Sequence, residues 1–95
     1  LSLTLDLKSP KGKEILFNLV EKSDVVIDNF RPGVMEGLGF DYEALKEKNP
    51  KIISCSISGY GQTGPYRQRP AYDLVLQAIG GVVALTGEPG GKPVR

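Results

Sequence analysis

The sequence predicts an α/β fold, in which helices connect strands that pair in parallel. Three short segments have strand character, at residues 1–7, 25–27 and 52–58, and segments with helical signals separate them. This order of elements is typical of parallel pairing with right-handed crossovers. We therefore expect part of a Rossmann-like parallel sheet with crossover helices. Because three parallel strands leave uncovered sheet edges, we expect residues 1–95 to be a fragment of a larger domain.

The first half of the chain carries clear start signals for its elements. Residues 1–7 alternate strictly between leucine and polar residues, which predicts a strand with one apolar face. Ser9 predicts a helix N-cap, and Pro10 follows at the first helical position, where proline is tolerated. Residues 25–27 form a continuous apolar run, which predicts a parallel strand that is covered on both faces.

Short helices and the third strand follow. Pro32 predicts the start of a helical turn that runs through Met35 and is closed by Gly37 and Gly39. Asp41 predicts the N-cap of the next helix; Asn49-Pro50 ends it. In the strand at 52–58, Cys55 lies mid-strand, and we expect a buried, unreactive thiol.

The last third of the chain begins with a loop. Residues 59–70 are rich in glycine and proline, which predicts irregular structure. Asp73 then predicts the N-cap of a helix that extends to Val82, with Val75 and Ile79 on the same face. Within this helix Gly80-Gly81 predicts a bend or a close packing contact.

Composition excludes several classes of function. The chain has 12 basic and 11 acidic residues and a net charge of +1, which argues against nucleic acid or an anionic membrane as a partner. It has no histidine and only Cys55, so Ser-His and Cys-His pairs are excluded within these residues, and no metal site is expected. No apolar run approaches the roughly 20 residues that span a bilayer. We expect a cytoplasmic location.

The glycine-rich motif at residues 59–64 matches the G-x-G-x-x-G pattern after a predicted strand. A dinucleotide site requires a helix to begin at once, but Pro65 follows and no helix is predicted there. A plain surface loop is one alternative. We favour a ligand-facing loop beside the carboxyl end of a strand, where open α/β sheets bind ligands.

A second candidate, residues 29–33 (Asn-Phe-Arg-Pro-Gly), also follows a predicted strand. The asparagine amide and free backbone amides there can hold a nucleotide or a pantetheine group. The alternative is a simple turn, in which Asn29 caps a helix and Phe30 packs inside; the residues alone favour this alternative. Lys8 can meet a phosphate, but a solvated lysine is the more common outcome at such a position. Asp6 and Asp28 are weak candidates for a reactive carboxylate.

Three strings together resemble the class III CoA transferases, the formyl-CoA and carnitine CoA transferase family, whose relatives include the α-methylacyl-CoA racemases. They are residues 29–35, residues 56–66, and Tyr72-Asp73-Leu74 with the Gly80-Gly81 helix. The resemblance implies a CoA-binding, Rossmann-like larger domain and an interlocked homodimer. It implies an enzyme that transfers coenzyme A from an acyl-CoA to a small carboxylic acid, with coenzyme A as co-substrate and no metal.

The resemblance also implies roles for individual residues. The implied coenzyme A site consists of Leu5, Lys8, Asn29, Phe30, Arg31 and Leu38. The implied substrate loop consists of Gly59, Tyr60, Gly61, Gln62 and Tyr72. The family often has a phosphate-contacting arginine where this chain has Gly37, so one phosphate contact is missing; Arg31 or Lys8 can replace it.

The same resemblance places the catalytic aspartate beyond Arg95, so no aspartate of this chain, including Asp73, is expected to be catalytic. The chain alone is expected to be inactive. The racemases carry a histidine immediately before the aspartate that corresponds to Asp73, because α-proton transfer needs a base. Here that residue is Tyr72, a poor base near neutral pH, which favours a transferase. A racemase-type fragment and a non-catalytic truncated domain remain the alternatives.

Overall fold

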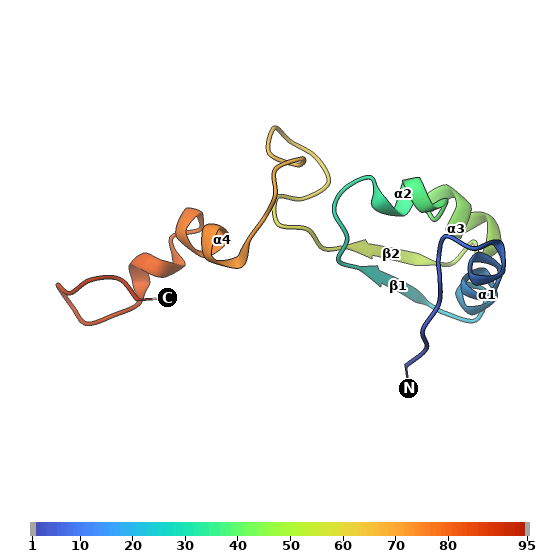
Figure 1. Ribbon diagram of the computed structural model, residues 1–95, viewed down its shortest axis with the longest axis horizontal. Coiled ribbons are helices and arrows are strands. Elements are labelled where there is room, and N and C mark those ends of the chain that lie inside the picture. Colours follow the sequence, from blue (N-terminus) through green and yellow to red (C-terminus); the bar gives the residue numbers. More distant parts are fainter. Residues whose placement is uncertain (1, 95) are drawn as a thin grey trace. The chain divides into compact units, whose positions relative to one another are not determined.

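The computed structural model describes residues 2–94, which form two compact units with the boundary between Ile57 and Ser58. The two units are described separately. The elements in chain order are α1 (Pro10–Val20), β1 (Val25–Asp28), α2 (Val34–Leu38), α3 (Tyr42–Lys48), β2 (Ile53–Ser56), α4 (Asp73–Ile79) and the 3₁₀ helix η1 (Val82–Leu85) (Figure 1).

The first unit contains the sheet. β1 and β2 pair in parallel, from Val25 opposite Ile53 to Asp28 opposite Ser56. Two helices, α2 and α3, lie between these strands in the chain, and α1 packs on α3. This arrangement confirms the predicted α/β class with a parallel sheet, which has two strands within residues 2–94.

The strand predicted at residues 1–7 is wrong for residues 2–7, which have no strand structure, and Leu1 lies outside the described residues. A strand requires a backbone partner, and alternation alone does not supply one. Leu7 instead packs against the core while Leu3 is exposed. The backbone N–H of Lys8 donates to the Asp6 carboxylate at 3.0 Å, and this turn leads the chain into α1.

Local capping chemistry explains where α1 and α3 begin. The Ser9 hydroxyl accepts a hydrogen bond from the N–H of Gly12 at 3.1 Å, and Pro10 is the first helical residue, as predicted. The Asp41 carboxylate accepts one from the N–H of Ala44 at 3.0 Å, which confirms its predicted role as the N-cap of α3.

The core of the first unit is small and lies between the helices and one face of the sheet. Its buried members are Val20, Phe40, Leu45 and Ile52. The ring of Phe17 packs on Phe40 at a centroid distance of 5.2 Å. These contacts join α1, α3 and the segments before α3 and β2.

The opposite face of the sheet is exposed in this structure. Val26 packs against the core, but its neighbours Val25 and Ile27 are exposed, Ile27 to 67%. Cys55, which lies opposite Ile27 in the sheet register, is exposed as well. The predictions of a strand covered on both faces and of a buried Cys55 thiol are therefore wrong for this chain, because side chains alternate between the faces and the core covers only one of them.

Two helix boundaries also differ from prediction. Gly39, with φ of 83°, is the C-cap of α2, as expected for a closing glycine, but Gly37 lies inside the helix. Asp73 is the first residue of α4, and Tyr72 occupies the N-cap position. The chain bends at Gly80-Gly81, as predicted, because Gly81 adopts φ of 77° and starts η1, so Val82 lies outside α4.

Candidate functional site

The carboxyl ends of β1 and β2 are joined by a set of hydrogen bonds that also holds the segment after β1. The carbonyl of Asp28 accepts from the N–H of Ile57 at 2.9 Å, which continues the strand pairing. The Asp28 carboxylate accepts from the Ser56 hydroxyl and, at 3.0 Å, from the N–H of Phe30. We call this set of residues, 28–30 with 56–57, the strand-end corner.

Asn29 also bridges the strand-end corner, but here the residue after β1 is the donor. Its side-chain amide donates to the carbonyl of Ile57 at 2.6 Å, so it ties the end of β1 to the end of β2. It does not cap α2, whose N-cap is Gly33, with φ of 89° and no side-chain hydrogen bond. Phe30 is 44% exposed. The simple-turn interpretation, with Asn29 as a cap and Phe30 packed inside, is therefore wrong on both points.

The corner offers three kinds of contact to a ligand. The Asn29 side chain is exposed and retains a carbonyl oxygen with no hydrogen-bond partner among residues 2–94. Phe30 presents an apolar ring, and Arg31 an exposed guanidinium. A short amide-containing chain with a phosphate matches this combination, since ligand sites pair apolar surface with a few polar groups and arginine binds phosphate through a planar fork.

The other residues of the implied coenzyme A site are also in the first unit. Lys8 is exposed and Leu5 is half-buried, both in the segment before α1. Leu38 is half-buried against the core, where it anchors α2. In α2, a side-chain carbon added at Gly37 would meet no atom within 4 Å, so the position at which the resembling family often has arginine is open space.

The predicted substrate loop lies in the second unit and contains an aromatic pair. Tyr60 packs edge-on against Tyr66, with centroids 5.8 Å apart, and the Arg69 guanidinium lies 4.1 Å from the centre of the Tyr66 ring. Residues 59–70 have no helix or strand, as predicted, and a helix does not follow Gly64, which removes the context that a dinucleotide motif requires. Gln62 is exposed in this loop.

Two further loop positions have specific geometry. A side-chain carbon at Gly59 would lie 2.1 Å from the β-carbon of Ala71, so only glycine fits where the loop closes on itself. Gly61 adopts φ of 79°, a left-handed conformation that favours glycine. Tyr72 is 66% exposed at the start of α4 and is available for contact with another group.

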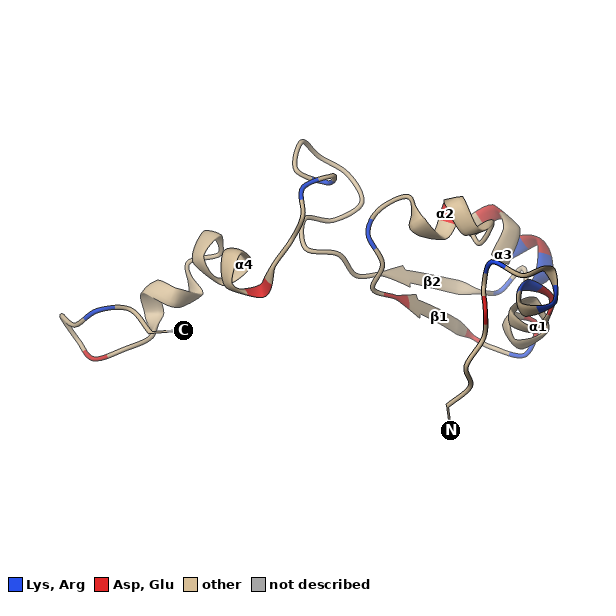
Figure 2. Ribbon diagram, viewed as in Figure 1, with Lys and Arg blue, Asp and Glu red and all other residues tan. Residues whose placement is uncertain are grey.

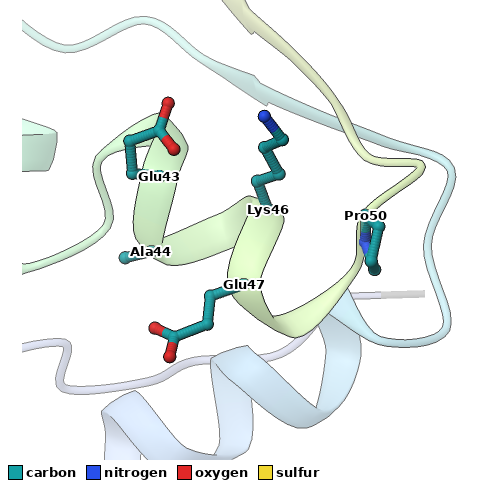
Figure 3. Close-up of a pocket in the computed structure, with 5 residues that line it drawn as sticks. All are labelled: Glu43, Ala44, Lys46, Glu47 and Pro50. Atoms are coloured by element: carbon teal, nitrogen blue, oxygen red, sulfur yellow. The ribbon is translucent and has the colours of Figure 1, made fainter.

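A shallow depression of about 610 Å³ lies elsewhere on the first unit. Glu43, Ala44, Lys46, Glu47 and Pro50 line it (Figure 3). The side chains of Lys46 and Glu47 point to opposite sides of α3 in that view. Two carboxylates against one ammonium disfavour an anionic ligand, and both signs of charge are interspersed along α1 and α3 (Figure 2). The strand-end corner is the better site for a phosphate-bearing ligand.

The structure adds residues to the site that the sequence did not single out. Ser56 and Ile57 complete the corner, and Asp28 is a hydrogen-bonded structural carboxylate in which both oxygens have partners. Within residues 2–94 no cluster of three or more potential metal ligands occurs, and no helix is long and apolar enough to cross a membrane. The sequence carried no signal for Ser56, because its place opposite Asp28 depends on the register of the two strands.

Comparison with known proteins gives consistent matches. The family model for CoA-transferase family III matches residues 1–95. An acyl-CoA transferase of Fusarium pseudograminearum is 48% identical and an acetyl-CoA:oxalate CoA-transferase of Acetobacter aceti 49% identical, each over 94 residues, which are 99% of this chain but 21% and 24% of those proteins. The crystal structure of a CAIB/BAIF family protein from Brucella suis superposes with a TM-score of 0.90 at 47% identity, over 99% of this chain and 25% of that one. The chain spans about a quarter of the length of these relatives.

Proposed function

The chain belongs to CoA-transferase family III, and we propose that it forms the coenzyme A-binding part of an enzyme that transfers coenzyme A from an acyl-CoA to a small carboxylic acid. The observation that carries this proposal is the family match over residues 1–95, with relatives such as the formyl-CoA:oxalate CoA-transferase of Streptomyces coelicolor at 46% identity. The exposed Asn29, Phe30 and Arg31 at the strand ends support it.

Each proposed contact has a physical basis. The free oxygen of the Asn29 amide accepts a hydrogen bond from a pantetheine amide, and the Phe30 ring covers an apolar part of the same chain. Arg31 and Lys8 are exposed cations that attract phosphates. Leu5 and Leu38 contribute apolar surface beside them. The loop residues Gly59 to Gln62 and Tyr72 contact the acyl group or the acceptor acid.

The reaction requires a nucleophile that we place after Arg95. In the proposed transfer, an aspartate carboxylate attacks the thioester carbonyl, the carbon–sulfur bond breaks, and coenzyme A leaves as the thiolate. The thiolate then attacks the aspartyl carbonyl of the resulting mixed anhydride, which releases the donor acid and leaves an aspartyl-CoA thioester. The acceptor carboxylate attacks this thioester and expels the thiolate again. Attack of the thiolate on the acceptor carbonyl of this second anhydride releases the acceptor as its CoA thioester and restores the aspartate carboxylate. We propose no metal, a cytoplasmic location and an interlocked homodimer for the whole enzyme. The resemblance supports the absence of a metal and the homodimer, and the cytoplasmic location is an expectation from the sequence.

The direct test is calorimetric titration of coenzyme A into the full-length protein, followed by acyl-transfer assays with a panel of acyl-CoA donors and small dicarboxylic acids. We expect binding and transfer, with transfer abolished when the aspartate after the glycine-rich turn at residues 87–91 is replaced by alanine. Exchange of the α-proton of a 2-methylacyl-CoA without transfer would instead establish a racemase. A folded protein that does not bind coenzyme A would support a non-catalytic domain.

Replacement of Gly37 by arginine tests the missing phosphate contact. We expect coenzyme A affinity to rise by about threefold to tenfold, because the new guanidinium enters open space on the proposed phosphate side. The free energy of unfolding also rises, by about 0.5 to 1 kcal/mol, since glycine is a poor helix former. Titration at low ionic strength measures the first effect and thermal unfolding the second.

The matched control is Gly37→Ala, which carries the same helix-propensity gain without a charge. It is expected to stabilise α2 and to leave the affinity for coenzyme A unchanged. Equal affinity of the arginine and alanine variants would show that the α2 position does not face a phosphate of the ligand.

A further inference from the structure

Asp28 is a buried charged residue at the point where β1 ends. Its side chain is 8% exposed, whereas Asp6, Asp24 and Asp73 are exposed. Burial of a carboxylate is unfavourable unless hydrogen bonds replace its water contacts. Here both oxygens have partners: one accepts from the N–H of Phe30 at 3.0 Å, and the other from the hydroxyl of Ser56.

One of these hydrogen bonds sets the direction of the backbone after β1, and the other sets the orientation of the Asp28 carboxylate. The bond to Phe30 connects residues two apart, and such a turn stops the strand and sets the direction of the backbone that follows. The bond from Ser56 fixes the rotation of the carboxylate against β2, which pairs with β1 at this position. Asn29, between the two ends of the turn, then reaches the carbonyl of Ile57 at 2.6 Å.

We propose that Asp28 is a positioning residue for coenzyme A. It acts through its neighbours, because its carboxylate sets the turn from which Asn29 and Phe30 project, and Ser56 orients that carboxylate. This inference rests on the proposed function, since it takes coenzyme A as the ligand of the corner. Asp28 itself is buried and makes no contact with the ligand.

The test measures coenzyme A binding and transfer kinetics for full-length variants. For Asp28→Ala we expect the dissociation constant to rise on the order of tenfold, while kcat at saturating acyl-CoA changes by less than about twofold. Asp28→Asn keeps both contacts, because its oxygen accepts from Phe30 and its amide donates to Ser56. This variant is expected to bind within about twofold of the unmodified protein. Ser56→Ala removes one contact and is expected to raise the constant by about threefold.

The matched control is Asp41→Ala. Asp41 also accepts a backbone hydrogen bond through its carboxylate, from Ala44 at 3.0 Å, but it starts α3 and lies outside the corner. We expect a lower melting temperature with unchanged affinity. Equal losses of affinity in Asp28→Ala and Asp41→Ala would overturn the inference, as would unchanged binding in Asp28→Ala or failure of Asp28→Asn to retain it.

The proposed function is tested separately by the unmodified protein. If that protein fails to bind coenzyme A, the proposed function fails and this inference fails with it. If the unmodified protein binds and the Asp28 variants bind equally well, only the inference fails. Should Asp28→Ala not fold, Ser56→Ala and Asp28→Asn decide the question, with the outcomes given above.

Discussion

Replacement of Phe40 by alanine is expected to lower the free energy of unfolding by about 3 to 5 kcal/mol. Phe40 is 1% exposed and is the largest member of a buried cluster with only three other residues, Val20, Leu45 and Ile52. Its ring packs on Phe17 at 5.2 Å. The loss combines the transfer free energy of the ring with the cost of the cavity that it leaves, because the surrounding side chains fill such a cavity only in part.

The effect is measured by urea unfolding of the full-length protein, followed by circular dichroism and by hydrogen exchange at the amides of α1 and α3. Exchange matters because it reports the first unit even if other parts of the protein unfold separately. We expect protection in both helices to fall together, since α1 and α3 meet through the cluster around Phe40.

Phe30→Ala is the matched control, because it removes the same side chain at an exposed position. It is expected to change the free energy of unfolding by less than about 1 kcal/mol. In the proposed function Phe30→Ala also weakens coenzyme A binding. The Phe40 variant is therefore expected to lose mainly stability, and the Phe30 variant mainly affinity for coenzyme A. Similar destabilisation in both variants would contradict the assignment of Phe40 to the core and Phe30 to the site.

The elements that the sequence predicted well are those defined by neighbours along the chain. Ser9-Pro10 and Asp41 mark the starts of α1 and α3 because a cap is a contact between residues three apart. The β-branched runs of β1 and β2 are similarly local. The parallel pairing followed from the helices between them, which leave enough chain for a crossover connection.

Several of the predictions that failed depend on partners far along the chain. The alternation of leucine in residues 2–7 gives this segment one apolar face. A strand also needs a neighbouring strand to which its backbone can hydrogen-bond, and alternation does not provide one. Burial of Cys55 depends on what covers that face of the sheet, and no periodicity in β2 contains this information. The corner contact between Asp28 and Ser56 is also non-local, because it joins residues 28 positions apart.

For the candidate site, the sequence indicated the location but not the geometry. Ligands of open α/β sheets bind at strand carboxyl ends, and this rule made residues 29–33 a candidate. The residues alone favoured a simple turn, and the family resemblance assigned Asn29 and Phe30 to a coenzyme A site. Whether Asn29 faces a helix or the neighbouring strand depends on Gly33, whose left-handed conformation gives α2 a glycine N-cap and leaves the asparagine amide for Ile57. The structure was needed to distinguish these two outcomes.

Gly12→Ala is expected to lower the free energy of unfolding by about 1 to 3 kcal/mol, although alanine is the better helix former. An added β-carbon at Gly12 would lie 2.0 Å from the carbonyl oxygen and 2.8 Å from the carbonyl carbon of Asp6. These are backbone atoms, so no side-chain rotation relieves the clash. The segment before α1 must move away from the helix.

That movement has a consequence for binding. The Asp6 carbonyl accepts from both the N–H of Ser9, at 3.2 Å, and its hydroxyl, at 2.9 Å, so displacing it disturbs the cap of α1 and the segment that carries Leu5 and Lys8. In the proposed function, coenzyme A affinity therefore falls together with stability. Thermal unfolding and calorimetric titration of the same full-length variant measure both quantities.

Gly37→Ala supplies the comparison, since its added carbon meets no atom within 4 Å and should stabilise α2 by about 0.5 to 1 kcal/mol. The same substitution is thus expected to change the free energy of unfolding in opposite directions in the two helices, because an added carbon clashes with the backbone at Gly12 and meets open space at Gly37. If Gly12→Ala also stabilises the protein, residues 2–7 do not pack against the start of α1 as described, and the contribution of Leu5 and Lys8 to the coenzyme A site loses its structural support.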